Sequence, residues 1–209
     1  MSFEEVLSDL NEWHFFREFT NSRSTFRTIS NEELELADSL VWLGELLIIF
    51  QLKQRAHVSS PDPLTEEKWF KNKILGKATR QIRDTLRYLQ SHANIQVRNR
   101  RDHVLTLRLV DIKQLHKLVV HLPNAVLPDH CRRLKFHRSK TAGIIHVIPA
   151  NDYLGIVGTL LTPMEVSEYL SFREGLIDRH EAHIFDVPEP ALMGQFLSGD
   201  FDARPSLEH

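Results

Sequence analysis

The sequence predicts an α/β (α+β) protein in which a mixed β-sheet is flanked by helices and followed by C-terminal helices. Three observations lead to this fold class. An amphipathic helical segment opens the chain, an apolar hairpin follows it, and a long helical segment then precedes several short apolar strands. The 209 residues are 42% hydrophobic and 26% charged, which is ordinary for one globular domain that needs no disulfides.

Residues 2–19 are expected to form the first helix. Ser2 and Glu5 have the spacing of a capping box, which satisfies free amides at a helix start. Apolar side chains recur at helical spacing through this segment, namely at Phe3, Val6, Leu7, Leu10, Trp13 and Phe16. Residues 20–30 are rich in Ser, Thr and Asn, and they are predicted to form a loop.

Residues 36–42 and 46–53 are predicted to be two strands of a hairpin that turns at Leu43-Gly44-Glu45. The second strand, Leu-Leu-Ile-Ile-Phe-Gln-Leu-Lys, is apolar on both faces until its end. A strand with two apolar faces is typical of the centre of a sheet that is covered on both sides. The segment 54–64, around Pro61-Asp62-Pro63, is predicted to be a loop.

A long helix is expected over residues 65–90. Thr65 can cap it, and the acidic residues Glu66 and Glu67 suit the positive end of a helix dipole. The predicted buried stripe consists of Phe70, Ile74, Ala78, Ile82, Leu86 and Leu89.

The second half of the chain is predicted to add further strands and two helices. Asn151 can cap a helix over 152–161, and Thr162 with Glu165 forms a second capping box, followed by Pro163 at the first helical position. The expected segments are strands at 95–99, 103–110, 117–122 and 144–148, a polar loop at 127–141, and helices at 152–161 and 163–178.

The expected organisation is a core over residues 1–150, helices over 151–180 that pack on it, and a tail over 181–206 with weak structural signals. The tail is interpreted as leading to further sequence in a longer protein. Residues 207–209, Leu-Glu-His, resemble the start of a vector-derived histidine tag and are not expected to contribute to the fold.

The charge distribution is uneven although the net charge is only −2. Residues 66–140 contain 18 Lys and Arg against 6 Asp and Glu, whereas the rest of the chain contains 8 against 22. A basic middle between acidic ends is typical of a face that binds nucleic acid. The alternative is that the acidic ends fold over the basic middle and neutralise it.

Cellular location is predicted from three features. Cys131 is the single cysteine, so no internal disulfide can form, which suits a reducing cytoplasm. The acidic start of the chain lacks the basic and apolar parts of a signal peptide. The longest apolar run, residues 46–50, is far too short to cross a membrane. We therefore expect a cytoplasmic protein with no membrane partner.

The hairpin carries the residues that indicate a chemistry. Gln51 and Lys53 share one face of their strand, and Asp38 on the paired strand could lie beside them. Asp38, the Gln51 side-chain oxygen and the Leu52 carbonyl could supply three oxygen ligands to Mg²⁺ or Mn²⁺. Lys53 could orient an attacking water, and Glu35 could hold a water of the metal shell. This set predicts metal-dependent phosphodiester hydrolysis.

This arrangement resembles the PD-(D/E)xK nuclease superfamily, which has the restriction-endonuclease-like fold. Asp38 stands for the Asp of that motif, Gln51 for its Glu, Lys53 for its Lys, and Glu35 for the extra acid of many members. The resemblance covers about residues 1–150 and implies a Mg²⁺- or Mn²⁺-dependent endonuclease acting on DNA. The segment also resembles an uncharacterised bacterial family with Glu-Leu-x-Asp, an apolar hairpin and a terminal Lys.

Gln51 departs from this pattern because it is neutral where the superfamily has a carboxylate. Some modification-dependent restriction enzymes of the superfamily also carry Gln-x-Lys. Loss of one negative charge should weaken binding of a cation, and Mn²⁺ is then expected to serve better than Mg²⁺. The alternative function is therefore a catalytically inactive domain of the same fold that binds nucleic acid or a protein partner.

The long helix supplies the candidate nucleic-acid contacts. Lys77 and Gln81 lie four residues apart and share a helix face, so Lys77 could meet a phosphate while Gln81 supports the metal shell. Lys73 and Arg80 are further candidates for contacts with the backbone of DNA. The alternative is a solvated helix whose charges meet only water.

Two further interpretations concern partners and other sites. The apolar region 144–178 contains more large side chains than one helix face needs, so it could form core or the surface of a homodimer. The residues concerned are Tyr153, Leu160, Leu161, Tyr169 and Phe172. His180 and His183 are three residues apart rather than four, so a helical zinc pair is not predicted, and the chain has no Gly-rich nucleotide-binding motif.

Overall fold

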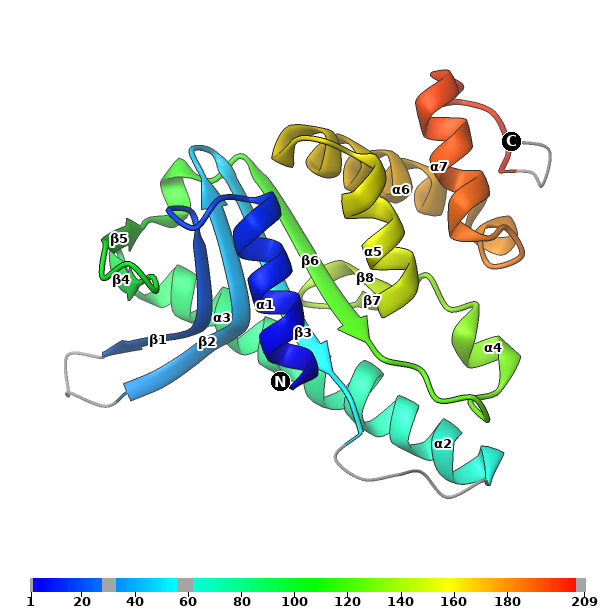
Figure 1. The fold of residues 1–209 in the computed structure, drawn as a ribbon, viewed down its shortest axis with the longest axis horizontal. Coiled ribbons are helices and arrows are strands. Elements are labelled where there is room, and N and C mark those ends of the chain that lie inside the picture. The colour runs from blue at the N-terminus through cyan, green and yellow to red at the C-terminus, as the bar shows by residue number, and fades with distance from the viewer. Residues whose placement is uncertain (1, 28–32, 56–61, 206–209) are drawn as a thin grey trace.

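The computed structural model describes residues 2–27, 33–55 and 62–205, and it confirms the mixed α/β class. Its main sheet has six strands in the order β1-β2-β3-β6-β8-β7 (Figure 1). The pairs β3–β6 and β6–β8 are parallel, and the other neighbours are antiparallel. The strands are β1 Thr20–Arg27, β2 Glu33–Leu43, β3 Leu46–Lys53, β6 Gln114–His121, β7 Phe136–Ser139 and β8 Gly143–Pro149, with a separate hairpin of β4 Ile95–Arg98 and β5 Val104–Leu107.

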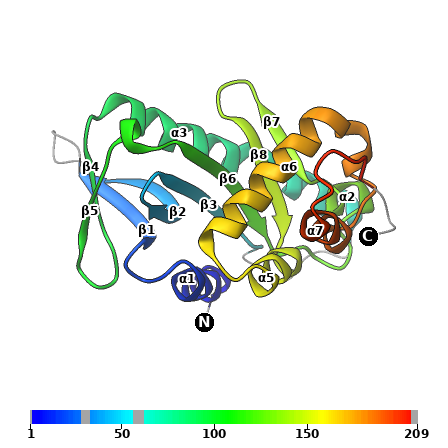
Figure 2. The ribbon, with the colours of Figure 1, turned by 90° about the horizontal axis from the view of Figure 1, so that it is seen from above.

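Helices cover both faces of the sheet. Figure 2 shows the long helix on one side of the sheet and α1 and α5 on the other. The α-helices are α1 Phe3–His14, α2 Pro63–Trp69, α3 Thr79–Ser91, α4 Asp129–Arg132, α5 Ala150–Thr159, α6 Pro163–Ile184 and α7 Glu189–Ser198, and a short 3₁₀ turn covers Leu109–Asp111. Among the described residues, no helix is long and apolar enough to span a membrane.

Strand β3 lies at the centre of the sheet, as its two apolar faces predict. It pairs with β2 on one side and with β6 on the other, and its residues from Leu46 to Leu52 are buried. Ile48 and Phe50 belong to the core under α1, α5 and α6, whereas Leu47 and Ile49 belong to the core under the long helix. The alternation of a strand thus divides one apolar run between two cores.

The long helix runs from Pro63 to Ser91, and its middle, residues 70–78, is π-helical. Asp62 caps its start by accepting from the Leu64 and Thr65 amides, so the expectation that Thr65 is the cap is wrong. The predicted stripe is buried, with Leu86 only partly so. A π-helix closes its hydrogen bonds on the fifth residue, so it favours apolar positions spaced by four or more.

Several local predictions hold at the helix starts. Both capping boxes are present, Ser2 with Glu5 on α1 and Thr162 with Glu165 on α6. The first helix is shorter than expected and ends at His14, because Phe16 has a positive φ of 64° that a helix does not accommodate. The predicted cap at Asn151 is wrong. Helix α5 begins at Ala150, and Pro149 occupies the N-cap position.

Three segments contain more helix and strand than the sequence predicts. The predicted loop 20–30 contains β1, which pairs with β2, while residues 28–30 lie outside the described residues. The predicted loop 127–141 contains α4 and β7. The expected tail from residue 181 contains the end of α6 and α7, whose apolar residues join the same core as β3. Part of the predicted loop 54–64, residues 56–61, also lies outside the described residues.

The apolar residues that could have formed a dimer surface are used inside the chain. Tyr153, Leu160, Tyr169 and Phe172 are all buried in the core under α5, α6 and α7. Leu161 is the exception, with 83% of its surface exposed. This region therefore gives no support to a homodimer.

A buried ion network fastens α6 and α7 to the rest of the protein. The Glu189 carboxylate on α7 accepts from the Tyr169 hydroxyl at 2.6 Å and from the Lys135 amine at 3.0 Å. The Arg173 guanidinium lies 3.2 Å from the same carboxylate, and burial of Glu189 leaves water no access to these charges. A buried charge is tolerated only when it is paired in this way.

We expect Glu189→Ala to destabilise the protein by about 3–5 kcal/mol, because it leaves two buried cations without their anion. Urea unfolding followed by circular dichroism measures this change. The control is Arg138→Ala, which removes exposed ion pairs with Asp178 and Glu181 and should cost less than about 1 kcal/mol. Equal costs for the two variants would contradict a structural role for the network.

We also expect acid to destabilise the fold through His121. This side chain is fully buried at the end of β6 against the Phe70 ring, and burial lowers its pKa from 6.5 to about 4. Between these two pKa values the unfolded chain binds a proton that the folded chain does not. The free energy of unfolding therefore falls as the pH falls through this range. The loss reaches on the order of 3 kcal/mol when the pH is at the lower pKa. Urea unfolding at several pH values should show a shallower loss in His121→Leu, and an unchanged slope would contradict the assignment.

Candidate functional site

Most of the residues predicted to carry chemistry line one cleft of about 660 Å³, here called the Asp38 cleft. It lies where β2 and β3 meet the π-helical segment, with α1 and β1 at its rim. Seven of the predicted site residues are among its lining, which consists of Glu4, Thr25, Glu35, Asp38, Leu52, Lys53, Gln54, Arg55, Trp69, Lys73, Lys77 and Gln81. Gln51 is buried beside the cleft, and Arg80 lies outside it.

The Lys53 amine stands at the centre of the predicted ligand set. It donates to the Asp38 carboxylate at 2.7 Å, to the Gln51 side-chain oxygen at 2.8 Å and to the Leu52 carbonyl at 3.2 Å. Gln51 and Lys53 therefore share a strand face, as the alternation of a strand predicts. Three oxygen atoms thus converge on one positive charge that is mostly shielded from water.

The path of β2 explains why Asp38 reaches this position. The pairing of β2 with β3 ends at Ser39 and Phe50, whereas β2 goes on pairing with β1 as far as Glu33. Figure 1 shows the first half of β2 bending away from β3. The Leu52 amide, left without a strand partner on this side, donates to the Asp38 carboxylate at 2.6 Å. The opening between the two strands is the floor of the cleft.

Glu35 adds a second carboxylate to the same wall. Its side chain is exposed to the cleft, and its pKa is raised, first by partial burial and then by the nearby Asp38 charge. Lys53 and Lys77 oppose this shift. Two neighbouring carboxylates that repel one another favour the binding of a cation near both of them.

The opposite wall is basic. Lys73 and Lys77 come from the π-helical segment and Gln81 follows one turn later on α3. Within the described part of the chain, neither lysine forms an ion pair or hydrogen bond, so both amines are available to an anion. Gly76 lies between them, and a Cβ there would come within 3.3 Å of the Lys71 carbonyl, a tight contact for the widened helix.

Arg55 is a cleft residue that the sequence did not point to. It follows β3 and pairs with the fully buried Glu66 at 2.8 Å, and its guanidinium also lies over the Trp69 ring. This contact fixes the start of the long helix against the end of β3. Glu66 is the sequence signal for this contact, although its position in the sequence indicates only an acid that suits the helix dipole.

Outside the cleft, several basic side chains of the segment 66–140 pair with acids from the two ends of the chain, as the alternative interpretation of the charge pattern holds. Arg100 pairs with Asp9 at 2.5 Å, and Arg101 pairs with Glu18. Further along the chain, Lys135 pairs with Glu189 and Arg138 with Asp178. Among the described residues, Lys73 and Lys77 of the Asp38 cleft have no such acidic partner.

The three oxygens around the Lys53 amine fit the needs of a hard divalent cation. Asp38, the Gln51 amide oxygen and the Leu52 carbonyl are the donor types that Mg²⁺ and Mn²⁺ accept, and they already surround a cation in the form of the amine. Glu35 supplies additional negative charge nearby.

Comparison of the chain with protein-family models, with curated proteins and with solved structures finds no match in any of the three. The function is therefore argued from the geometry of the cleft.

We expect Lys53→Met to raise the affinity of the cleft for Mn²⁺ about tenfold or more. The substitution removes a positive charge that competes for the same oxygens, and at this range one charge is worth more than 1.4 kcal/mol. Isothermal titration calorimetry measures the change, with Lys68→Met, outside the cleft, as the matched control. Weaker binding in Lys53→Met than in the control would contradict a shared position for amine and metal.

Proposed function

We propose that the protein is a metal-dependent phosphodiesterase that cleaves DNA in the Asp38 cleft. The observation that carries the proposal is the convergence of Asp38, Gln51 and the Leu52 carbonyl on one cationic position, opposite two unpaired lysines. This arrangement agrees with the resemblance of the hairpin to PD-(D/E)xK nucleases.

The oxygens of Asp38, Gln51 and Leu52 would hold Mg²⁺ or Mn²⁺, which supplies charge stabilisation at the phosphate and a more acidic bound water. Glu35 would hold a water of the metal shell, and its raised pKa makes it a better proton acceptor than an ordinary glutamate. Lys53, moved from its present partners, would donate to a phosphate oxygen as negative charge develops there.

The basic wall provides the contacts that position DNA. Lys73 and Lys77 lie one helical turn apart, so each could meet a phosphate of the same strand. Gln81 lies at the end of this row, where its amide can reach the metal shell. Arg80 is exposed but does not line the cleft, so it is not part of the basic wall proposed to position DNA.

A second candidate function is an inactive domain that binds nucleic acid without cutting it. Two observations favour it. Gln51 contributes no charge to the ligand set, and the Lys53 amine already satisfies all three oxygens. In such a protein Lys53 would serve as a permanent internal cation, and the lysines of the wall would still bind phosphate.

The proposed function predicts cleavage of plasmid, linear duplex or single-stranded DNA in Mn²⁺ or Mg²⁺, with no cleavage in EDTA. Lys53→Ala and Asp38→Asn should each lower the cleavage rate at least about 100-fold, because the first removes the donor to the reacting phosphate and the second removes the charged ligand of the metal. Gel assays at matched protein concentration measure the rate. Circular dichroism confirms that the variants fold, and Lys68→Ala serves as the control.

Measuring DNA binding together with cleavage separates the two candidate functions. Fluorescence anisotropy with a short duplex should show weaker binding in Lys73→Ala with Lys77→Ala, and a salt dependence reduced by about two phosphate contacts. The pair Arg80→Ala with Arg83→Ala, on the same helix, controls for loss of charge. Binding through the cleft lysines without cleavage in any metal would establish the inactive domain, and equal losses in both pairs would contradict the cleft as the DNA site.

A further inference from the structure

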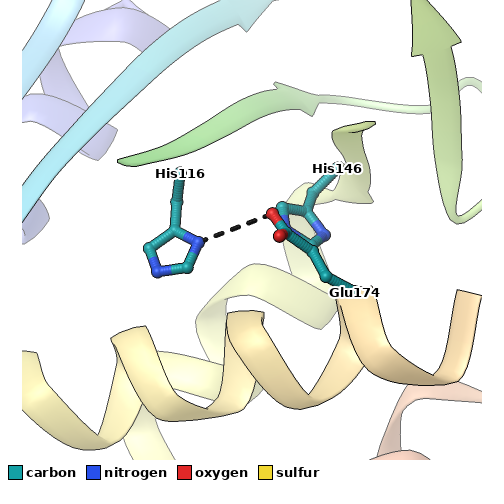
Figure 3. A group of neighbouring side chains, drawn as sticks. All are labelled: His116, His146 and Glu174. Atoms are coloured by element: carbon teal, nitrogen blue, oxygen red, sulfur yellow. Dashed lines mark hydrogen bonds and ion pairs between the residues drawn. The ribbon is translucent and has the colours of Figure 1, made fainter. Parts of the chain in front are cut away.

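A second cluster of metal-ligating side chains lies far from the Asp38 cleft. His116 is on β6 and His146 on the neighbouring β8, and Glu174 reaches them from α6 (Figure 3). Both histidines are buried, and Glu174 is partly exposed. They belong to the sheet face covered by α6, whereas the Asp38 cleft opens on the face covered by the long helix.

The ligand atoms have the spacing of neighbours around one ion. One oxygen of Glu174 lies 3.7 Å from Nδ1 of His116 and 3.2 Å from Nε2 of His146. All three side chains offer atoms within 4.8 Å of one another. Around a tetrahedral Zn²⁺ with bonds of 2.0–2.1 Å, neighbouring ligands are separated by about 3.3 Å. Small side-chain rotations would thus bring all three into one coordination shell.

The hydrogen bonds around His116 engage its Nε2 and leave Nδ1 without a hydrogen-bond partner among the described residues. The Ser167 hydroxyl donates to the Gln114 side-chain oxygen at 3.0 Å, so its own oxygen accepts from Nε2–H of His116 at 2.9 Å. A neutral His116 then points the lone pair of Nδ1 at the Glu174 carboxylate, and this buried nitrogen has no hydrogen-bond partner. A lone pair facing a carboxylate in the interior repels it unless a cation lies between them.

We propose that His116, His146 and Glu174 form a second metal site that binds a borderline divalent cation of the Zn²⁺ class. Two imidazole nitrogens and one carboxylate oxygen suit Zn²⁺ or Co²⁺ rather than Mg²⁺, which prefers oxygen ligands. Ser167 and Gln114 hold the first imidazole in the tautomer that ligation needs. The bound ion would join β6, β8 and α6, and it would raise the stability of the folded chain.

The test uses Co²⁺, whose visible d–d absorption reports a tetrahedral site. The full chain carries Asp38→Asn to disable the cleft and is first stripped with EDTA. We expect one Co²⁺ per chain, a visible spectrum, displacement by Zn²⁺, and a higher melting temperature with either ion. Glu174→Gln should weaken binding more than about tenfold, and Ser167→Ala should weaken it about tenfold while keeping all three ligands. His121→Asn is the control for loss of a buried histidine outside the cluster.

Absence of Co²⁺ absorption and of any thermal shift in the folded protein would overturn the proposal. Binding that is equally weakened by His121→Asn and by Glu174→Gln would also overturn it, because the ion would then lie elsewhere. If Glu174→Gln fails to fold, Ser167→Ala decides the question, since an unchanged affinity in that variant contradicts ligation by His116.

Discussion

The hydrogen bond between the Leu52 amide and the Asp38 carboxylate is the contact on which the architecture of the cleft depends. Strand β2 pairs with two neighbours, but its residues before Ser39 pair with β1 alone. A central strand cannot leave a buried amide unpaired, and the carboxylate takes the place of the missing strand. The same carboxylate also accepts from the Lys53 amine. Asp38 therefore satisfies the sheet amide that β2 leaves unpaired, and it also contributes to the cleft.

Much of the fold follows from local patterns in the sequence. The apolar run of β3, the alternation that places Gln51 beside Lys53, and both capping boxes depend on neighbours within a few residues, so a single sequence carries them. The long helix contained an additional signal. Its apolar residues recur at every fourth position from Phe70 to Leu86, which a regular helix of 3.6 residues per turn does not keep on one face. The π-helical segment accommodates that spacing.

The features that the sequence did not predict depend on distant partners. β1 and β7 are polar and carry weak strand signals, and they are strands because β2 and β8 offer them free edges. α7 is held by Glu189, whose cationic partners come from residues 135 and 173. The histidines of the second cluster lie on different strands, and Glu174 is on a helix. No spacing along the chain therefore predicts that they come together. Only the fold brings such groups together.

The way the main sheet ends has a consequence for association. One edge strand, β7, has four residues and carries Arg138, and the other, β1, lies beside the small β4 hairpin. Short and charged edges resist addition of a strand from another chain, which is the usual route to fibrillar aggregation. A partner that approaches β7 would therefore meet charged side chains rather than a long open backbone edge, and recognition there would depend on chemistry that point substitutions can alter.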